Sequence, residues 1–178
     1  SLLAYDGSNW TSYQPDLSID YVNGLAIDGA DHKWLGTWDQ GLCEFDGARW
    51  TVYTTDNSEL PSNYVSDVIA DHRGAIWVGA WGGLVRIEGA NWTVFDEPTS
   101  GMPLESVSTF FLSPNGSLWM QADNWLCGAP VLLERAETGF HLHDVLGDAG
   151  APNRRFESFA FDQRGGLWAG TWGGLSPP

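Results

Sequence analysis

Three tryptophans at equivalent positions are the residues of this chain best suited to bind a ligand. Trp38, Trp81 and Trp172 each stand four residues after another tryptophan. An indole ring offers a flat apolar face on which the C–H face of a sugar can stack. Asn63 ends the polar segment Asn57–Asn63, whose side chains could bond sugar hydroxyls. Aromatic faces beside polar groups are typical of a saccharide site.

Two arginines form a second candidate binding group. Arg154 and Arg155 are adjacent, although the chain has only 8 basic residues against 23 acidic ones. Adjacent guanidinium groups can capture a carboxylate or sulfate group of a ligand. The alternative is that they pair with aspartate or glutamate side chains of the protein itself.

Groups for catalysis or metal binding are few. Asp67 and Glu157 stand close to equivalent apolar positions and could form an acid–base pair if their carboxyl groups met. His141 and His143 alternate along one face of an expected strand and Asp144 follows, but no third ligand is evident. We therefore expect no catalytic group, no metal and no cofactor.

All these residues belong to a repeated sequence. The repeat is anchored by tryptophans that are 43, 42 and 49 residues apart, namely Trp34, Trp77, Trp119 and Trp168. Six residues before them stand Asp28, Asp71, Ser113 and Asp162. A catalytic residue is needed once, whereas a turn residue is needed in every copy, so we expect these aspartates to cap turns through backbone N–H groups. We expect the four anchor tryptophans in the core.

Each copy contains four short apolar runs separated by turn residues. The second copy reads YVSDVIA, AIWVGA, GLVRIEG and NWTVF, which are rich in Val, Ile and aromatics and predict strands. Glycine stands three residues before each anchor, except for Asp31, and a positive φ is expected there. Four strands recurring every 40–45 residues or so predict an all-β fold, a β-propeller of four blades with four strands each.

The motifs resemble a known family. D-x-x-G-x-(I/L)-W-x-G-(T/A)-W-x-G-L, followed by DG-x-x-WT-x-(Y/F) and by NSELPSNYV, is similar to the two-component regulator propeller repeat. The resemblance covers essentially the whole chain, although the third copy has Gln121 for glycine and Asp123-Asn124 for Trp-Gly. It implies a sensor-type domain in the periplasm or outside the cell, because this repeat builds sensor domains of hybrid histidine kinases and occurs in secreted bacterial proteins.

The resemblance also implies where the candidate ligand residues lie. It places Trp38, Trp81 and Trp172 in the loop between the second and third strands of their blades. This loop shares a face of the propeller with the loop that contains Asn63, so both would surround the mouth of the central channel. The alternative is that these tryptophans pack between blades and hold them apart.

The chain ends predict how the last blade is completed. SLLAYDG at the start aligns with the third strand of a blade, and the chain stops as the fourth copy reaches its own third strand. We expect residues 1–178 to form a single propeller domain whose N-terminal strands complete the last blade, which would protect its edge. Two chains could join as halves of an eight-bladed ring, one chain could close as a four-bladed ring, or the chain could be a segment of a longer array.

Charge and hydropathy exclude several classes of partner. The net charge of −15 argues against nucleic acid and anionic membranes as partners. No apolar run approaches the roughly 20 residues of a membrane span, and the N-terminus shows no signal peptide. The expected function is a non-catalytic binding or sensor module for a glycan or other small polar ligand. The alternatives are a scaffold that only self-assembles as a homodimer, and a propeller enzyme such as a polysaccharide lyase or glycosidase.

Overall fold

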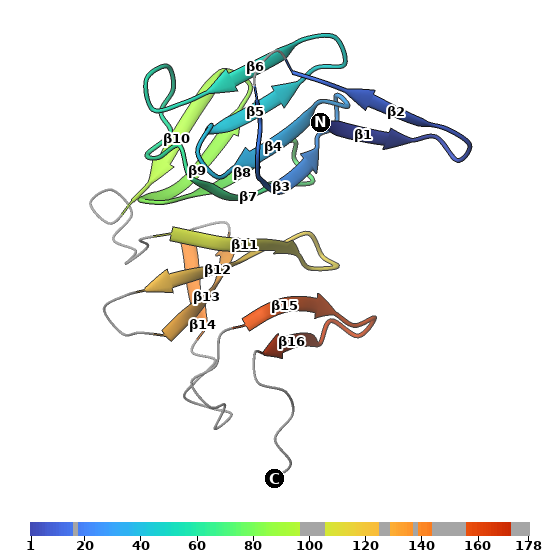
Figure 1. The fold of residues 1–178 in the computed structure, drawn as a ribbon. Coiled ribbons are helices and arrows are strands. Elements are labelled where there is room, and N and C mark those ends of the chain that lie inside the picture. Colours follow the sequence, from blue (N-terminus) through green and yellow to red (C-terminus); the bar gives the residue numbers. More distant parts are fainter. Residues whose placement is uncertain (16–17, 97–105, 125–128, 137–138, 144–155, 172–178) are drawn as a thin grey trace.

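The protein is all-β over the part of the chain that its structure, a computed structural model, describes. The described residues are 1–15, 18–96, 106–124, 129–136, 139–143 and 156–171 (Figure 1). They form sixteen strands and, over these ranges, no helix. Within each sheet, every strand pairs with the strand before or after it in the sequence, and all these pairs are antiparallel. Propeller blades have this arrangement.

Three sheets are complete four-stranded blades. The first consists of β3 (Val22–Ile27), β4 (Lys33–Thr37), β5 (Leu42–Phe45) and β6 (Trp50–Tyr53). The second consists of β7 (Val65–Ala70), β8 (Ile76–Ala80), β9 (Gly83–Glu88) and β10 (Asn91–Phe95). The third consists of β11 (Ser106–Leu112), β12 (Leu118–Asn124), β13 (Ala129–Ala136) and β14 (Gly139–His143). Two further sheets have two strands, β1 (Leu2–Tyr5) with β2 (Trp10–Tyr13) and β15 (Phe156–Phe161) with β16 (Leu167–Thr171).

The turn between the first two strands of a blade is held by the repeated aspartate. Oδ1 of Asp71 accepts hydrogen bonds from the backbone N–H groups of Arg73 (2.8 Å) and Ala75 (2.9 Å). Its Oδ2 accepts the indole N–H of Trp77 at 2.9 Å. The same indole bond joins Asp28 to Trp34 and Asp162 to Trp168. The expected capping role is confirmed, and the aspartate additionally fixes the anchor tryptophan.

The residue three places before each anchor has the expected backbone conformation. Asp31 has φ +67°, and the glycines at the same position have φ between +81° and +86°, namely Gly74, Gly116 and Gly165. This is the left-handed region, which glycine and aspartate tolerate better than other residues.

The third blade departs from the rule because serine replaces the aspartate. Ser113 closes the turn by accepting the N–H of Gly116 at 2.8 Å, but its side chain does not reach the indole. The buried Nε1 of Trp119 has no hydrogen-bond partner among the described residues. Its ring stacks on His143 at 4.5 Å instead. A buried N–H without a partner is destabilising, so this blade lacks a bond that the others have.

The hydrophobic core lies between neighbouring blades. Between the first and second blades the buried residues include Trp34, Leu42, Val65, Val68 and Val78. Between the second and third they include Trp77, Leu84, Val107, Met120 and Leu133. Trp34 is 6% exposed and Trp77 2%, so these two anchors are core residues as expected.

The inner strands of adjacent blades are tied by side chains. Asn23 on β3 donates to the carbonyl of Val65 on β7 at 2.8 Å. Asp67 on β7 accepts the backbone N–H of Phe110 on β11 at 2.8 Å. The β3 and β7 backbones approach closely at Gly24, where a Cβ would lie 2.6 Å from a carboxylate oxygen of Asp67. The order of small and polar residues along these strands therefore sets the spacing of the blades.

Within the described residues, the N-terminal strands do not complete the last blade, which corrects the expected pairing. β1–β2 is a sheet of its own at one end of the row of blades, and β15–β16 lies at the other end (Figure 1). Tyr13 of β2 contacts Phe45 of the first blade with ring centroids 5.1 Å apart, rather than completing the last blade. Within the described residues, the last sheet therefore has two strands, and the N-terminal strands lie beside the first blade.

One anchor tryptophan is also placed differently from its prediction. Trp168 keeps its 2.9 Å bond to Asp162 but is 67% exposed, so the expectation that all four anchors lie in the core is wrong for this residue. The reason is that no described blade packs against the face of β16 that carries it.

Candidate functional site

Two sets of loops meet on one face of the blades. The N–H of Gly41, after β4, donates to the carbonyl of Asn63, before β7, at 2.9 Å. The N–H of Trp81, after β8, donates to the carbonyl of Tyr64 at 3.1 Å. The loop that ends the second strand of a blade therefore lies beside the loop that begins an inner strand, as the resemblance implied.

These loops bring three aromatic side chains together, here called the aromatic edge: Trp38, Tyr64 and Trp81. Tyr64 lies between the two indoles, with its ring centroid 4.9 Å from that of Trp38 and 6.4 Å from that of Trp81. Both contacts are edge-on. Trp38 is 57% exposed and Trp81 60%, so neither indole is buried between the blades.

Sequence reasoning missed Tyr64. The signal was present, because Tyr64 precedes Val65 at the start of β7 as Tyr21 precedes Val22 at the start of β3. Tyr21 has a comparable backbone role, since its carbonyl accepts the N–H of Trp38 at 3.1 Å. A tyrosine at this repeat position thus accompanies each tryptophan of the aromatic edge.

Of the remaining predicted site residues, Asn63 lies within the described part of the structure. Asn63 is half-buried, and its Oδ1 accepts the backbone N–H of Thr55 at 2.9 Å, which fixes the loop. Its Nδ2 group meets no acceptor within the described ranges and can donate to a ligand. Trp172, Arg154 and Arg155 lie outside the described residues.

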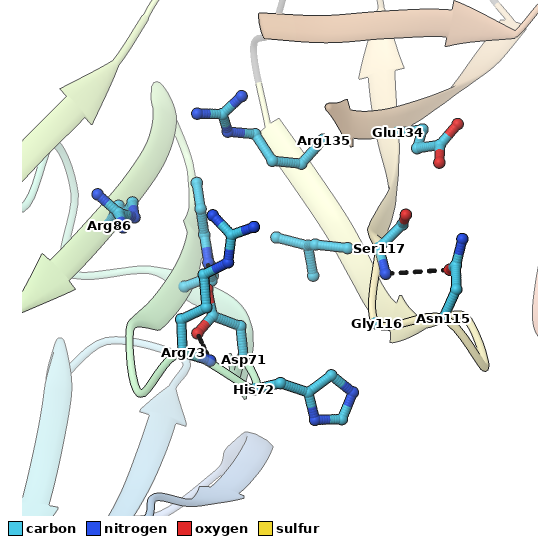
Figure 2. Close-up of a pocket in the computed structure, with 11 residues that line it drawn as sticks. Asp71, His72, Arg73, Arg86, Asn115, Gly116, Ser117, Glu134 and Arg135 are labelled. Atoms are coloured by element: carbon cyan, nitrogen blue, oxygen red, sulfur yellow. Dashed lines mark hydrogen bonds between the residues drawn. The ribbon is translucent and has the colours of Figure 1, made fainter. Parts of the chain in front are cut away.

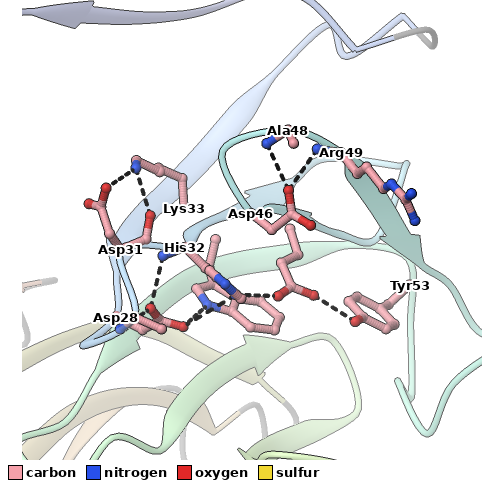
Figure 3. A network of polar contacts seen from close by, with 11 residues as sticks. Asp28, Asp31, His32, Lys33, Asp46, Ala48, Arg49 and Tyr53 are labelled. Atoms are coloured by element: carbon pink, nitrogen blue, oxygen red, sulfur yellow. Dashed lines mark hydrogen bonds and ion pairs between the residues drawn. The ribbon is translucent and has the colours of Figure 1, made fainter.

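The outer part of the first blade carries a polar network that serves the fold (Figure 3). Nδ1 of His32 lies 2.7 Å from Glu44, whose other oxygen accepts the hydroxyl of Tyr53 at 2.7 Å. Burial raises the pKa of Tyr53 to about 12, helped by the bond to Glu44. Burial alone would raise the pKa of Asp28, but hydrogen bonds from Trp34 and from the N–H of His32 bring it below its usual value. These carboxylates are occupied in joining strands.

Of the candidate catalytic and metal groups, the side chain of Glu157 and the whole of Asp144 lie outside the described part of the structure. Both carboxylate oxygens of Asp67 accept backbone N–H groups, from Val68 at 2.9 Å and from Phe110 at 2.8 Å. Burial raises the pKa of Asp67, against the lowering effect of these bonds. Asp67 is thus a structural link between blades. His143 lies 3.2 Å from Glu134, and no group of three metal-ligating side chains is found among the described residues.

Comparison with known families identifies the repeat. Residues 59–82, which run from the loop before β7 to the loop after β8, match the family model of the two component regulator propeller. Over this segment the chain is similar to that repeat family. The matched segment includes Asn63, Tyr64 and Trp81, so it contains the second-blade half of the aromatic edge.

Solved structures show that these repeats form a β-propeller. The extracellular domain of BT4673 from B. thetaiotaomicron, described as belonging to a hybrid two component system, matches with a TM-score of 0.68 and 20% identity over 91% of this chain. PorZ, a surface component of the type-IX secretion system of Porphyromonas gingivalis, matches with a TM-score of 0.73 and 20% identity over 95%. Virginiamycin B lyase from Staphylococcus aureus matches with a TM-score of 0.66 and 13% identity over 94% of this chain. The predicted fold is confirmed.

The chain is much shorter than these proteins. It spans 21% of the BT4673 domain, 27% of PorZ and 54% of the lyase. A comparison with curated protein sequences finds no match. Within the described ranges, no helix has the length and apolar character needed to cross a bilayer.

Proposed function

We propose that this propeller is a non-catalytic binding module of a sensor-type protein, located in the periplasm or outside the cell, that binds a glycan or other small polar ligand at the aromatic edge. The observation that carries the proposal is the exposure of Trp38 and Trp81, 57% and 60%, on either side of Tyr64. The location rests on the likeness to the extracellular domain of BT4673.

The chemistry of the aromatic edge fits a sugar. Two indoles and a phenol from two blades form a continuous aromatic surface, and continuous exposed aromatic surface is more typical of a binding site than a single exposed ring. A pyranose can stack its C–H face on an indole while its hydroxyls bond the Tyr64 hydroxyl and the Nδ2 group of Asn63. Because the rings already contact one another edge to face in their loops, little ordering is needed on binding.

Trp81→Ala tests this proposal. The variant should remain folded, because the ring is 60% exposed and its removal opens no cavity. Its affinity for the glycan found by screening the wild type should fall by about tenfold or more, since tryptophan contacts dominate binding energies. Isothermal titration measures the affinity, and circular dichroism with a melting curve measures the fold.

Trp10→Ala is the matched control. Trp10 on β2 is 68% exposed and pairs with Tyr5, with ring centroids 5.0 Å apart, so it is also an exposed indole beside a tyrosine. The Trp10→Ala variant should bind the glycan with the affinity of the wild type. Equal losses in both variants, or no ligand in a broad glycan screen, would contradict binding at the aromatic edge.

Self-assembly is the second function that a specific observation favours. Leu25 on β3 is 52% exposed, although the equivalent Val68 of the second blade is buried against the first. At the other end Trp168 is 67% exposed, although the equivalent Trp34 and Trp77 are buried against the next blade. The two ends thus expose the two halves of the contact that joins blades within the chain. We propose that a second copy covers them.

Light scattering at micromolar concentration measures this assembly. The expected mass is that of two chains, and Leu25→Glu should reduce it to one, because a charge in that contact would lose its hydration on burial. Leu25 is half exposed in the single chain, so the variant should keep its fold. A wild-type mass of one chain at all concentrations would refute the pairing and leave the ligand proposal untouched.

A further inference from the structure

A pocket lined by arginines lies between the second and third blades. Its volume is about 580 Å³. Arg73 comes from the β7–β8 turn, Arg86 from β9 and Arg135 from β13. Arg73 extends from its turn toward Arg135, and Arg86 lies on the side of the second blade (Figure 2). These are three of the 8 basic residues in a chain of net charge −15, so their meeting at one place is unusual.

The arginines on the two blades each stack on an aromatic ring. The guanidinium carbon of Arg86 lies 5.5 Å from the centroid of the Trp77 ring. That of Arg135 lies 5.2 Å from the Phe140 ring, and its Nη1 donates to the carbonyl of Gly139 at 2.8 Å. Stacked guanidinium groups keep their charge and present their N–H edges in a fixed direction.

The acids at the pocket are occupied elsewhere. Asp71 accepts three hydrogen bonds from its own turn and from Trp77. Glu134 lies 3.2 Å from His143, and Arg86 is paired with Glu88. The guanidinium of Arg73 forms no ion pair with any described residue. Burial lowers the pKa of Arg135, and the positive charges of Arg86 and Arg73 lower it further. The three guanidinium groups are thus close enough for Arg86 and Arg73 to act on Arg135, and an anion bound among them would reduce this repulsion.

The β11–β12 turn provides most of the remaining wall, and the apolar Leu118 follows it. Asn115, Gly116 and Ser117 form the β11–β12 turn on the opposite side. His72 packs so tightly on Gly116 that a Cβ there would lie 2.7 Å from its ring. This contact joins the turns of the two blades and closes one end of the pocket.

We propose that this pocket binds the carboxylate, sulfate or phosphate group of a small organic anion. Arginine forks match the geometry of these groups, and the volume falls in the range of sites for small organic ligands rather than for a bare ion. The pocket adjoins the turn before β8 and the aromatic edge includes Trp81 after β8, so the two lie at opposite ends of this strand. The anion site is therefore separate from the proposed glycan site.

Isothermal titration at low ionic strength tests the proposal with four probes: D-glucuronate, D-glucose 6-sulfate, sodium sulfate and D-glucose. At least one of the two anionic sugars should bind, and D-glucose should not. Binding of the sulfate ester alone assigns a tetrahedral group, and binding of the uronate alone assigns a carboxylate. Arg73→Gln should weaken binding roughly tenfold or more, because it removes charge-assisted hydrogen bonds.

Arg164→Gln is the control, because Arg164 occupies the same turn position in the fourth copy and donates its N–H to Asp162 as Arg73 does to Asp71. This variant also loses one arginine charge, but at a position outside the pocket, so it should bind the anions as the wild type does. Trp81→Ala should also keep anion binding, which separates this site from the aromatic edge. The proposal is overturned if no anion binds, if glucose binds as well as glucuronate, if Arg73→Gln binds normally, or if Arg164→Gln loses as much.

Discussion

Trp77→Ala is expected to lower the free energy of unfolding by about 3–5 kcal/mol, the cost typical of removing a buried tryptophan. Trp77 is 2% exposed and stacks on Phe95 with ring centroids 5.9 Å apart. It also contacts Phe140 of the third blade edge-on, at 6.4 Å. The alanine would leave a cavity between two blades and remove the indole donor that Asp71 accepts. Urea denaturation followed by fluorescence or circular dichroism measures the change.

Trp168→Ala provides the comparison at the same repeat position. Its indole bonds Asp162 at 2.9 Å as Trp77 bonds Asp71, but it is 67% exposed. The loss should be about 1 kcal/mol, the value of one hydrogen bond with little burial. Similar losses at both positions would show that something covers Trp168 in solution. A loss below about 1 kcal/mol at Trp77 would contradict the packed contact between the second and third blades.

Gly41→Ala is expected to cost about 3 kcal/mol or more, since it combines an unfavourable backbone conformation with a backbone clash. Gly41 has φ +77°, and a Cβ there would lie 2.1 Å from the carbonyl oxygen of Tyr53. Its carbonyl accepts the hydroxyl of Thr37 at 2.8 Å, and its N–H bonds Asn63 at 2.9 Å. The loop therefore cannot move away without losing the contact with the second blade.

Gly47→Ala separates the two contributions. Gly47 has φ +96°, and a Cβ there would meet nothing within 4 Å. It should lose about 1–2 kcal/mol from backbone strain alone. Thermal melts of the two variants beside the wild type give the difference. Equal losses would indicate that the Gly41 loop has room for a methyl group, contrary to the distance to Tyr53.

The local features of the blades could be predicted because they depend on residues close in the sequence. Asp71 and its turn lie within six residues of Trp77, and the positive φ of Asp31 follows from its place among glycines in the other copies. The ring closure could not be predicted in this way. Whether β1–β2 reaches β15–β16 depends on small rotations between blades, which add up along the row and leave no local trace in sequence.

The candidate sites show the same division. Trp38 and Trp81 could be found because they recur with the repeat, and Tyr64 could have been found from its counterpart Tyr21. The arginine pocket could not. Arg73 and Arg135 belong to different blades and have no common repeat position, so a comparison of copies treats each as an exception. A site that forms at only one contact between blades cannot be found by comparing equivalent positions of the copies.

The close fit between Gly24 and Asp67 limits how the blades can be rearranged. Neighbouring copies carry different residues at this position, and the space for the carboxylate exists because the preceding blade has no side chain there. In a tandem array of identical second blades, every Asp67 would face another Asp67, and the carboxylates would compete for one space. Such an array would need a glycine-bearing blade between each pair. The copies thus share one strand arrangement, but the residues at their contacts fit one particular neighbour. The order of the copies along the chain is therefore constrained by these contacts.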